Sequence, residues 1–503
     1  MIKQKVVNDT LQLSREEMRA VGYQVIDMIV NHFDSIQDKP AMPTGDEPPF
    51  ESFLEPLPEE GQDINHLLSD LQDNLFSHMW HPNHPRYMCF IPSSSNFVGV
   101  MGDLLATGFN VFSGVWRLAP AATMIEVVTI DWLRQMCGLP ETAGGIFVSG
   151  GSAANMMGLA TARDAKLNNQ TQGAVIYCSD QTHPVADRGL RLLGFERDQL
   201  RWLPSDENFQ LSLPALYQAV AEDKAAGRKP FCVIGNAGTT ATGAVDPLPE
   251  LADFCAEEGL WLHVDAAYGA AARLCEEGRE LLAGLGRADS VVFDPHKWLF
   301  QPYEIGCILV RDRFELRKTF SMSADLFRDV ERINAKVDFK DYGLQLSRDF
   351  KALKLWLSLK TFGVANVRQA VAKGIRAAEL AEEILRATPN WEIVSSAQLG
   401  IITFRYAPPE IPASDLNRLN QQIGDRMMAD GFAIVNTIPV KGKIVIRICP
   451  INPRLSESDL RETLKRLTEF GIETTRDMSL LRQISCGVND KWLNSCFIDR
   501  TNN

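Results

Sequence analysis

A chain of 503 residues, 45% of them hydrophobic and 23% charged, has the composition of an ordinary globular protein and is long enough for two to three domains. Its net charge of −13 and the lack of a Lys/Arg-rich block argue against nucleic-acid binding, and no apolar run is long enough to span a bilayer or to open a signal peptide. Ten cysteines without any Cys-x-x-Cys pair indicate a reduced, cytoplasmic protein.

Residues 1–85 are predicted to form an N-terminal helical segment. Ser14 and Glu17 have the spacing of a capping box, and apolar residues then recur at helical spacing as far as Phe33. The stretch 40–58 is rich in Pro, Glu and Gly, which predicts an extended connector. The helix could pack on its own chain or on a partner.

A large α/β domain is expected over residues 86–375. Short apolar runs alternate with helical patterns there, which is typical of a mostly parallel sheet covered by helices on both faces. Ligands bind beyond the carboxyl ends of such strands. The predicted strands cover 146–148, 174–178, 231–234, 260–264, 291–293 and 305–310.

A smaller C-terminal α/β domain is expected over residues 376–475, after a helical region at 350–387. Its predicted elements are strands at 401–406, 432–436 and 443–449, a helix at 413–430, and a helix that begins near Ser456. The tail, 476–503, shows no clear pattern.

The first strand is followed by Ser149-Gly150-Gly151-Ser152, which leads into a helix. Glycines allow close backbone approach, and a helix N-terminus offers free N–H groups, so this turn could hold a phosphate. A plain strand-to-helix turn explains it equally well. It lacks the spacing of a P-loop or a dinucleotide fingerprint.

Asp265 closes another apolar strand and is followed by Ala266-Ala267. A carboxylate at this place could hold Mg²⁺, but the phosphate loop and lysine of a nucleotidase are missing. It could instead pair with a pyridinium nitrogen and keep that nitrogen protonated, while the small alanines let a flat ring approach.

Lys297 and His183 follow two further strands. A lysine in a desolvated pocket can form an imine because burial lowers its pKa, although an isolated lysine would more often lie on the surface. The histidine ring could stack on a cofactor or hydrogen-bond a substrate, or it could be structural. His78, His81 and His84 fall at even spacing, but nearby prolines and the lack of carboxylates argue against a metal site.

These motifs together resemble the group II decarboxylases that depend on pyridoxal 5′-phosphate (PLP), and among them the aromatic-L-amino-acid decarboxylase branch. The resemblance rests on Ser179-Asp180-Gln181-Thr182-His183, His263-Val264-Asp265-Ala266-Ala267-Tyr268 and Asp294-Pro295-His296-Lys297-Trp298, and it extends from about residue 13 to about residue 471. It implies the fold-type-I aminotransferase architecture and a homodimer with the site at the subunit interface. It also implies decarboxylation of an amino acid by a PLP-dependent carboxy-lyase.

The same resemblance implies roles for individual residues. Lys297 would be the Schiff-base lysine, Asp265 the partner of the ring nitrogen and His183 the stacking histidine. The cofactor-binding set would be Ser152, Ala153 and Ala154 at the phosphate, with His183, Thr240, Asp265, Ala267, Asp294, His296 and Lys297. The side-chain pocket would be lined by Trp80, Phe90, Ile91, Pro92 and Phe112. This set is apolar and contains no arginine, which favours an aromatic or large hydrophobic substrate, unless these residues belong to the core.

The sequence departs from the family pattern at three places. Ala154 stands where Ser is common, and Asp294 stands where Asn is common. The loop at 320–329 has Leu326, or Phe327 in the neighbouring register, where the family has the tyrosine that returns a proton to Cα. Oxidative formation of an aldehyde is therefore an alternative to simple decarboxylation, with His183 or Tyr303 as other proton donors. An aminotransferase and a catalytically silent PLP-binding homologue are further alternatives.

Overall fold

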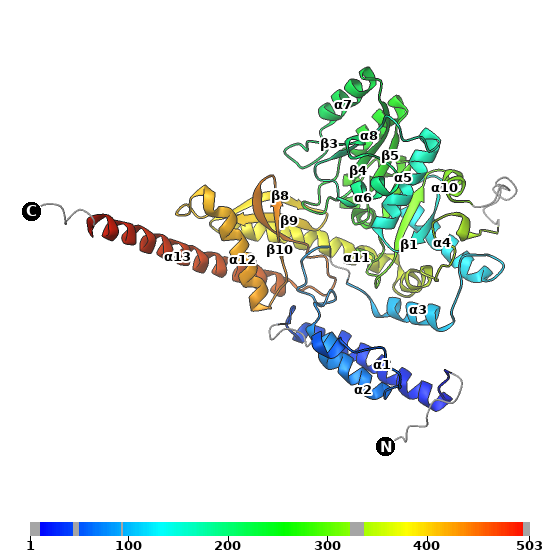
Figure 1. Ribbon diagram of the computed structural model, residues 1–503, viewed down its shortest axis with the longest axis horizontal. Helices are drawn as coiled ribbons and strands as arrows, with labels where there is room; N and C mark the ends of the chain where they lie inside the picture. Colours follow the sequence, from blue (N-terminus) through cyan, green and yellow to red (C-terminus); the bar gives the residue numbers. More distant parts are fainter. Residues whose placement is uncertain (1–10, 44–49, 92–93, 322–335, 496–503) are drawn as a thin grey trace, which may run out of the picture.

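The computed structural model describes residues 11–43, 50–91, 94–321 and 336–495, with the backbone alone over 483–495. Figure 1 shows a body built around two sheets, a pair of N-terminal helices beneath it and a long C-terminal helix that extends away from it. In the described ranges, no helix combines the length and apolar character needed to cross a bilayer.

The larger sheet has seven strands in the order β1-β7-β6-β5-β4-β2-β3. Strands β2 to β6 pair in parallel, whereas β7 runs antiparallel to both β6 and β1, so the prediction of a mostly parallel sheet is confirmed. The strands are β1 (Gly144–Val148), β2 (Ala174–Ser179), β3 (Leu200–Leu203), β4 (Lys229–Asn236), β5 (Trp261–Asp265), β6 (Ser290–Phe293) and β7 (Gly306–Val310). All of them except β3 coincide with apolar runs of the sequence.

Helices cover this sheet because its strands are apolar on both faces. Every residue of β2, β6 and β7 is buried, which is the pattern of a sheet enclosed between helical layers. The helices of this part are α3 (Phe97–Gly108), α4 (Pro120–Cys137), α5 (Gly151–Leu167), α6 (Val185–Leu192), α7 (Leu213–Ala225), α8 (Leu248–Glu258), α9 (Glu276–Leu281) and α10 (Arg313–Phe320). Helix α5 contacts β4, β5, β6 and β7 and thus packs across the middle of the sheet.

The smaller sheet has four antiparallel strands in the order β10-β11-β9-β8. They are β8 (Trp391–Gln398), β9 (Ile401–Tyr406), β10 (Asn436–Val440) and β11 (Lys443–Ile448). Helices α11 (Ala352–Ala387), α12 (Leu416–Asp430) and α13 (Glu457–Ser495) enclose a second apolar core with this sheet. The patternless tail is therefore helical as far as Ser495.

The predicted strand at 432–436 is wrong. Its central residue, Ile434, makes an isolated bridge to Tyr87, and its backbone bonds to Arg86 and Met88. This stretch thus ties the small sheet to the segment that leads into the large domain, and the strand begins only at Asn436.

The N-terminal helix α1 (Arg15–Ser35) has the predicted capping box: Glu17 N–H donates to Ser14 Oγ, and Ser14 N–H donates to Glu17 Oε2. Helix α2 (Ile64–Asp70) lies against it. No residue of α1 is buried in this single chain, although the helix carries apolar side chains such as Met18, Tyr23 and Val30.

Candidate functional site

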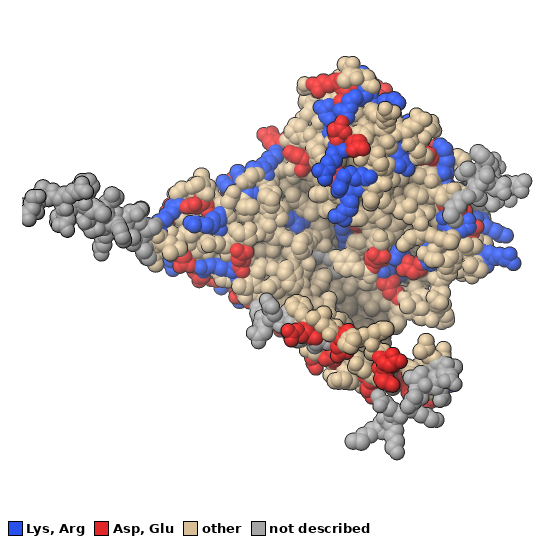
Figure 2. All heavy atoms as spheres, in the orientation of Figure 1, with Lys and Arg blue, Asp and Glu red and all other residues tan. Residues whose placement is uncertain are grey.

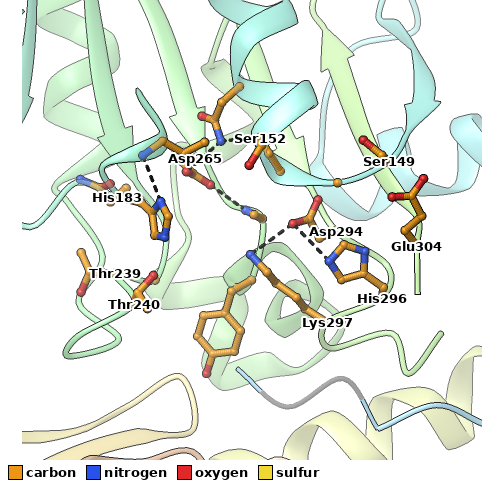
Figure 3. Close-up of a pocket in the computed structure, with 18 of the residues that line it drawn as sticks. Ser149, Ser152, His183, Thr239, Thr240, Asp265, Asp294, His296, Lys297 and Glu304 are labelled. Carbon is orange, nitrogen blue, oxygen red and sulfur yellow. Dashed lines mark hydrogen bonds and ion pairs between the residues drawn. The ribbon is translucent and has the colours of Figure 1, made fainter. Parts of the chain in front are cut away.

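A cavity of about 400 Å³ opens at the carboxyl ends of the parallel strands. Its lining includes Ser152, His183, Thr240, Asp265, Ala267, Asp294, His296 and Lys297, all of them residues that the sequence singled out. Figure 3 labels all of these residues except Ala267 and shows them arranged around one space, although they come from five separate connections of the sheet. The rule that ligands bind beyond the strand ends explains the convergence.

The amine of Lys297 forms an ion pair with Asp294, with Nζ 3.1 Å from Oδ2. Burial disfavours the charged ammonium, but the carboxylates of Asp294 and Asp265 outweigh burial and raise the lysine pKa. Burial acts in the expected direction, but the net pKa of Lys297 is raised and not lowered. The cause is a carboxylate three residues earlier, in the turn that follows β6.

His296 completes this corner of the cavity. Its Nδ1 accepts from the N–H of Ile305, and its Nε2 lies 3.7 Å from Asp294 Oδ2. Burial lowers the pKa of this imidazole, despite the nearby carboxylate. The other oxygen of Asp294, Oδ1, is buried and has no hydrogen-bond partner among the described residues.

Asp265 ends β5 on the opposite side of the cavity. Its Oδ2 accepts from Asn155 Nδ2 at 3.0 Å, and its Oδ1 accepts from the N–H of Ala267 at 3.2 Å. Both oxygens of the carboxylate are thus oriented before any ligand is bound.

His183 lies in the connection after β2. Its Nδ1 accepts from the N–H of Val185 at 3.2 Å, so the proton of the neutral ring resides on Nε2. Burial lowers its pKa, while Asp265 acts in the opposite direction. The ring is therefore a neutral, flat surface at one side of the cavity.

The glycine turn after β1 brings the backbone close to the other site residues. A Cβ at Gly150 would lie 3.0 Å from His296 Cε1, and a Cβ at Gly151 would lie 2.8 Å from Asp294 Oδ2. The N-terminus of α5 therefore reaches the cavity through Gly150, Gly151 and Ser152. The free N–H groups of this end suit a phosphate.

Ala153 and Ala154 are absent from the lining of the cavity, so their place at the phosphate stays a prediction. Ala154 is fully buried in the core of the large domain. Since the helix already begins at Gly151, these two residues belong to its first turn, and the lining residues lie one to two positions earlier in the sequence.

The proposed side-chain pocket does not join this cavity in the single chain. Trp80, Phe90, Ile91 and Phe112 are absent from its lining, and Trp80 and Phe90 are 41% and 54% exposed. Pro92 and the loop residues Leu326 and Phe327 lie outside the described residues.

Several lining residues were missed by the sequence analysis. Asn236 ends β4 and could have been found by the strand-end rule, and Asn155 lies one helical turn beyond the glycine pair. Val185, Gly238 and Glu304 were missed as well. Ser149, Gly150 and Gly151 belong to the turn that the sequence predicted to hold a phosphate, and Gln181 and Tyr268 stand in the motifs that carry the resemblance. In the part of the chain that the structure describes, no cluster of His, Cys, Asp or Glu could hold a metal ion.

The donor set fits pyridoxal phosphate. An amine for imine formation, a carboxylate for a ring nitrogen and a helix N-terminus for a phosphate surround one cavity of suitable size. The imidazole of His183 and the small side chain of Ala267 both line this cavity.

Comparison with known proteins gives the family. Residues 51–407 match the pyridoxal-dependent decarboxylase conserved domain. An aromatic-L-amino-acid decarboxylase from Bacillus atrophaeus is 46% identical over 472 residues, which cover 93% of this chain and 98% of that protein.

Two solved structures share the whole architecture. Oryza sativa TDC with PLP and tryptamine is 28% identical, with a TM-score of 0.86 over 93% of this chain and 100% of that chain. Rhodiola rosea 4-hydroxyphenylacetaldehyde synthase is also 28% identical, with a TM-score of 0.85 over 92% and 99% of the two chains. The chain therefore belongs to the pyridoxal-dependent decarboxylase family and is a carboxy-lyase that uses pyridoxal phosphate.

Proposed function

We propose that this enzyme converts an aromatic or large hydrophobic L-amino acid into the corresponding amine and CO₂. The observation that carries the proposal is the placement of the Lys297 amine and the Asp265 carboxylate on one cavity, in a chain of this family. The relative from Bacillus atrophaeus, which bears the name of an aromatic-amino-acid decarboxylase, supports the substrate class.

Bound pyridoxal phosphate supplies an electron sink for the bond that breaks between Cα and the carboxylate. Lys297 would hold the cofactor through its amine, Asp265 would keep the ring nitrogen protonated, and His183 would lie against the ring. Ser152 and the first N–H groups of α5 would bind the phosphate, with Thr240, Ala267, Asp294 and His296 as the remaining contacts.

The substrate side chain is assigned to Trp80, Phe90, Ile91, Pro92 and Phe112. Trp80 and Phe90 are exposed in the single chain. A second subunit lying against them would cover them, which would account for their separation from the cavity of a single chain.

We infer a homodimer with the site at the subunit interface. Helices α1 and α2 expose a series of apolar side chains that the rest of the chain leaves uncovered: Met18, Tyr23, Val30, Ile64 and Leu67. Figure 2 shows acidic side chains on the face of the N-terminal helices that is in view. Analytical ultracentrifugation tests this inference, and a monomer at micromolar concentration would contradict it.

We place the enzyme in the cytoplasm. The eight cysteines whose side chains the structure describes are all buried and free of disulfides, as expected in a reducing compartment. Fractionation of cells that express the full chain at native level tests this assignment.

Oxidative formation of an aldehyde is the second candidate, because Leu326 or Phe327 takes the place of the family's loop tyrosine. In that reaction one O₂ and one water are consumed, and CO₂, ammonia, peroxide and the aldehyde are released. The resemblance to the Rhodiola rosea synthase is consistent with this route.

Product analysis decides between the two. The cofactor-loaded full chain is incubated with Phe, Tyr, Trp, DOPA and Leu, in air and without oxygen, with Lys297→Ala as the control. Amine and CO₂ in equal amounts under both conditions, without peroxide, are the expected result. Aldehyde and peroxide formed only in air would establish the second candidate. A keto acid without CO₂ would indicate an aminotransferase, and cofactor binding without any product would indicate a silent homologue.

A further inference from the structure

A chain of buried hydrogen bonds runs behind Asp265, away from the cavity. Trp261 Nε1 lies 2.8 Å from Ser290 Oγ, and Ser290 Oγ lies 2.7 Å from His263 Nδ1. His263 Nε2 lies 2.9 Å from Asn155 Oδ1, and Asn155 Nδ2 lies 3.0 Å from Asp265 Oδ2. Five side chains thus form one unbroken series that ends at the carboxylate.

The strand geometry explains how this series is assembled. Trp261, His263 and Asp265 alternate along β5 and therefore point to the same face of the sheet. Ser290 is the direct neighbour of His263 on β6, and Asn155 reaches the same face from α5. The series therefore lies in the layer between the sheet and α5.

The chemistry of the two ends gives every bond in the series a direction. An indole N–H can only donate, so Ser290 accepts from Trp261. At the other end, the Asp265 carboxylate and the carbonyl of Gly151 can only accept, so Asn155 donates to both and its Oδ1 accepts from His263 Nε2–H. Nδ1 of the neutral imidazole is then an acceptor, and Ser290 Oγ–H donates to it. This orients the amide of Asn155, whose N–H groups point to Asp265 and to the carbonyl of Gly151. Every hydrogen bond in the series therefore points from Trp261 toward Asp265, whose ionised carboxylate can only accept.

Packing keeps the imidazole in place. His263 and Ser290 are fully buried, and Asn155 is 1% exposed. Helix α5 passes so close that a Cβ at Gly158 would lie 2.6 Å from His263 Cε1. Burial also lowers the pKa of His263 to about 4, so the ring is neutral at physiological pH and retains one donor and one acceptor nitrogen.

We propose that His263 is a positioning residue of this enzyme: held as the Nε2–H tautomer by Ser290, it fixes the amide of Asn155 and thereby orients the Asp265 carboxylate toward the ring nitrogen of the cofactor. The proposal rests on the pairing of Asp265 with that nitrogen, which belongs to the proposed function. It adds a second layer of residues, remote from substrate, on which the strength of that pairing depends.

The test compares cofactor affinity in two substitutions of His263. The amide of Gln can still donate to Asn155, whereas Leu fills the space without any hydrogen bond. The apo form of the full chain is titrated with pyridoxal phosphate, and the visible absorbance of the bound cofactor gives Kd. The melting temperature of the apo protein is recorded in parallel.

His263→Leu is expected to raise Kd about tenfold, which corresponds to about 1.4 kcal/mol, and His263→Gln is expected to restore most of the affinity. Ser290→Ala removes the hydroxyl that holds His263 as the Nε2–H tautomer, and it is expected to raise Kd by a smaller factor. The matched control is Thr161→Val on α5. It removes a buried hydroxyl that bonds only within its own helix, so it is expected to leave Kd unchanged.

A wild-type Kd in His263→Leu, or equal losses in the Leu and Gln variants, would overturn the proposal. If the Leu variant does not fold, Ser290→Ala and Thr161→Val carry the comparison, and equal Kd values in these two overturn it instead. Asp265→Asn serves as the reference. If this variant binds the cofactor normally, the proposed role of Asp265 has failed. If it binds weakly while His263→Leu does not, only the positioning role has failed.

Discussion

Lys297 and Asp294 form an ion pair of 3.1 Å within one turn after β6. In the role proposed for it, the lysine must lose its proton to react with pyridoxal phosphate. The pKa of Lys297 is raised because the carboxylates of Asp294 and Asp265 outweigh burial. The amine of Lys297 is therefore protonated over a wider pH range than the amine of a free lysine.

Asp294→Asn is expected to shift cofactor loading to lower pH. The substitution removes one of the two carboxylates that raise the pKa of Lys297, so a larger fraction of the amine is neutral at any pH below that pKa. The rate at which apo protein gains visible absorbance with pyridoxal phosphate, measured over a pH series, checks this expectation. Asp131→Asn, which removes the surface partner of Arg134, is the control. An unshifted pH curve in Asp294→Asn would contradict the argument.

Lys297→Ala is expected to lower decarboxylation by about three orders of magnitude or more, because the covalent link to the cofactor cannot form. Reduction of the loaded wild-type enzyme with borohydride should fix the cofactor on the peptide that contains Lys297, as mass spectrometry of a digest would show. The variant should give no labelled peptide and release all its cofactor on denaturation. Labelling at another lysine would refute the assignment.

The positions of the site residues follow largely from local sequence patterns. Asp265 closes an apolar run, Lys297 and His183 lie within a few residues of the ends of two others, and parallel strands present their carboxyl ends at one edge. All strands of the large sheet except β3, and the capping box of α1, follow from equally local patterns, apolar runs and the Ser14–Glu17 spacing. All these features depend on residues that are close together in the sequence.

The features that the sequence did not predict depend on distant contacts. Strand β8 is mostly half-buried and lacks a continuous apolar run, and residues 432–435 bond to the backbone of residues 86–88 instead of entering the small sheet. Asn155 and His263 are 108 residues apart, so nothing local joins them. The domain boundaries at 85, 375 and 475 stay a prediction, and α11 and α13 run through the last two.

A buried ion pair between Arg348 and Glu126 joins helix α4 to the end of strand β1. Arg348 Nη2 lies 2.6 Å from Glu126 Oε1 and also donates to the carbonyl of Phe147 at the end of β1. Glu126→Ala leaves a buried arginine without its charge partner, which is expected to cost about 3–5 kcal/mol of unfolding free energy. Urea unfolding of the apo protein measures the loss.

The exposed pair of Arg376 and Glu277 provides the control for that experiment. Because solvent screens such a pair, Glu277→Ala is expected to change the unfolding free energy by about 0.5 kcal/mol or less. Similar losses of unfolding free energy in the two variants would show that the buried pair contributes no more to stability than the exposed pair.

Acid is expected to loosen the junction between the N-terminal helices and the body through His84. This buried residue accepts from the N–H of Arg86 and donates to the carbonyl of Lys39, and burial lowers its pKa from 6.5 to about 4. The unfolded chain therefore takes up a proton first as the pH falls. The stability contributed by neutral His84 is complete above about pH 6.5 and is lost between that pH and about 4.

His84→Gln should reduce this acid sensitivity by roughly 2 kcal/mol between pH 7 and pH 5, since glutamine does not titrate. Thermal unfolding at pH 7 and pH 5 measures the difference, and His66→Gln on the exposed surface of α2 should leave it unchanged. An identical response of wild type and His84→Gln to pH would exclude His84 as the cause.

Gly158 offers a test of the hydrogen-bond series that leaves all its polar groups intact. In an ordinary helix, replacing Gly by Ala stabilises by roughly 0.5–1 kcal/mol. At Gly158 the new methyl group would lie 2.6 Å from His263 Cε1 and 2.8 Å from its Nδ1, so the imidazole must shift away from Ser290 and Asn155. Gly158→Ala is therefore expected to weaken cofactor binding several-fold and to lower the melting temperature.

Gly189→Ala on the neighbouring helix α6 is the matched control. Its new methyl group meets only ordinary contacts, the nearest at 3.5 Å, so it should show the usual gain in stability with an unchanged Kd. If both substitutions stabilise the enzyme and neither changes Kd, the position of His263 has no influence on the cofactor site.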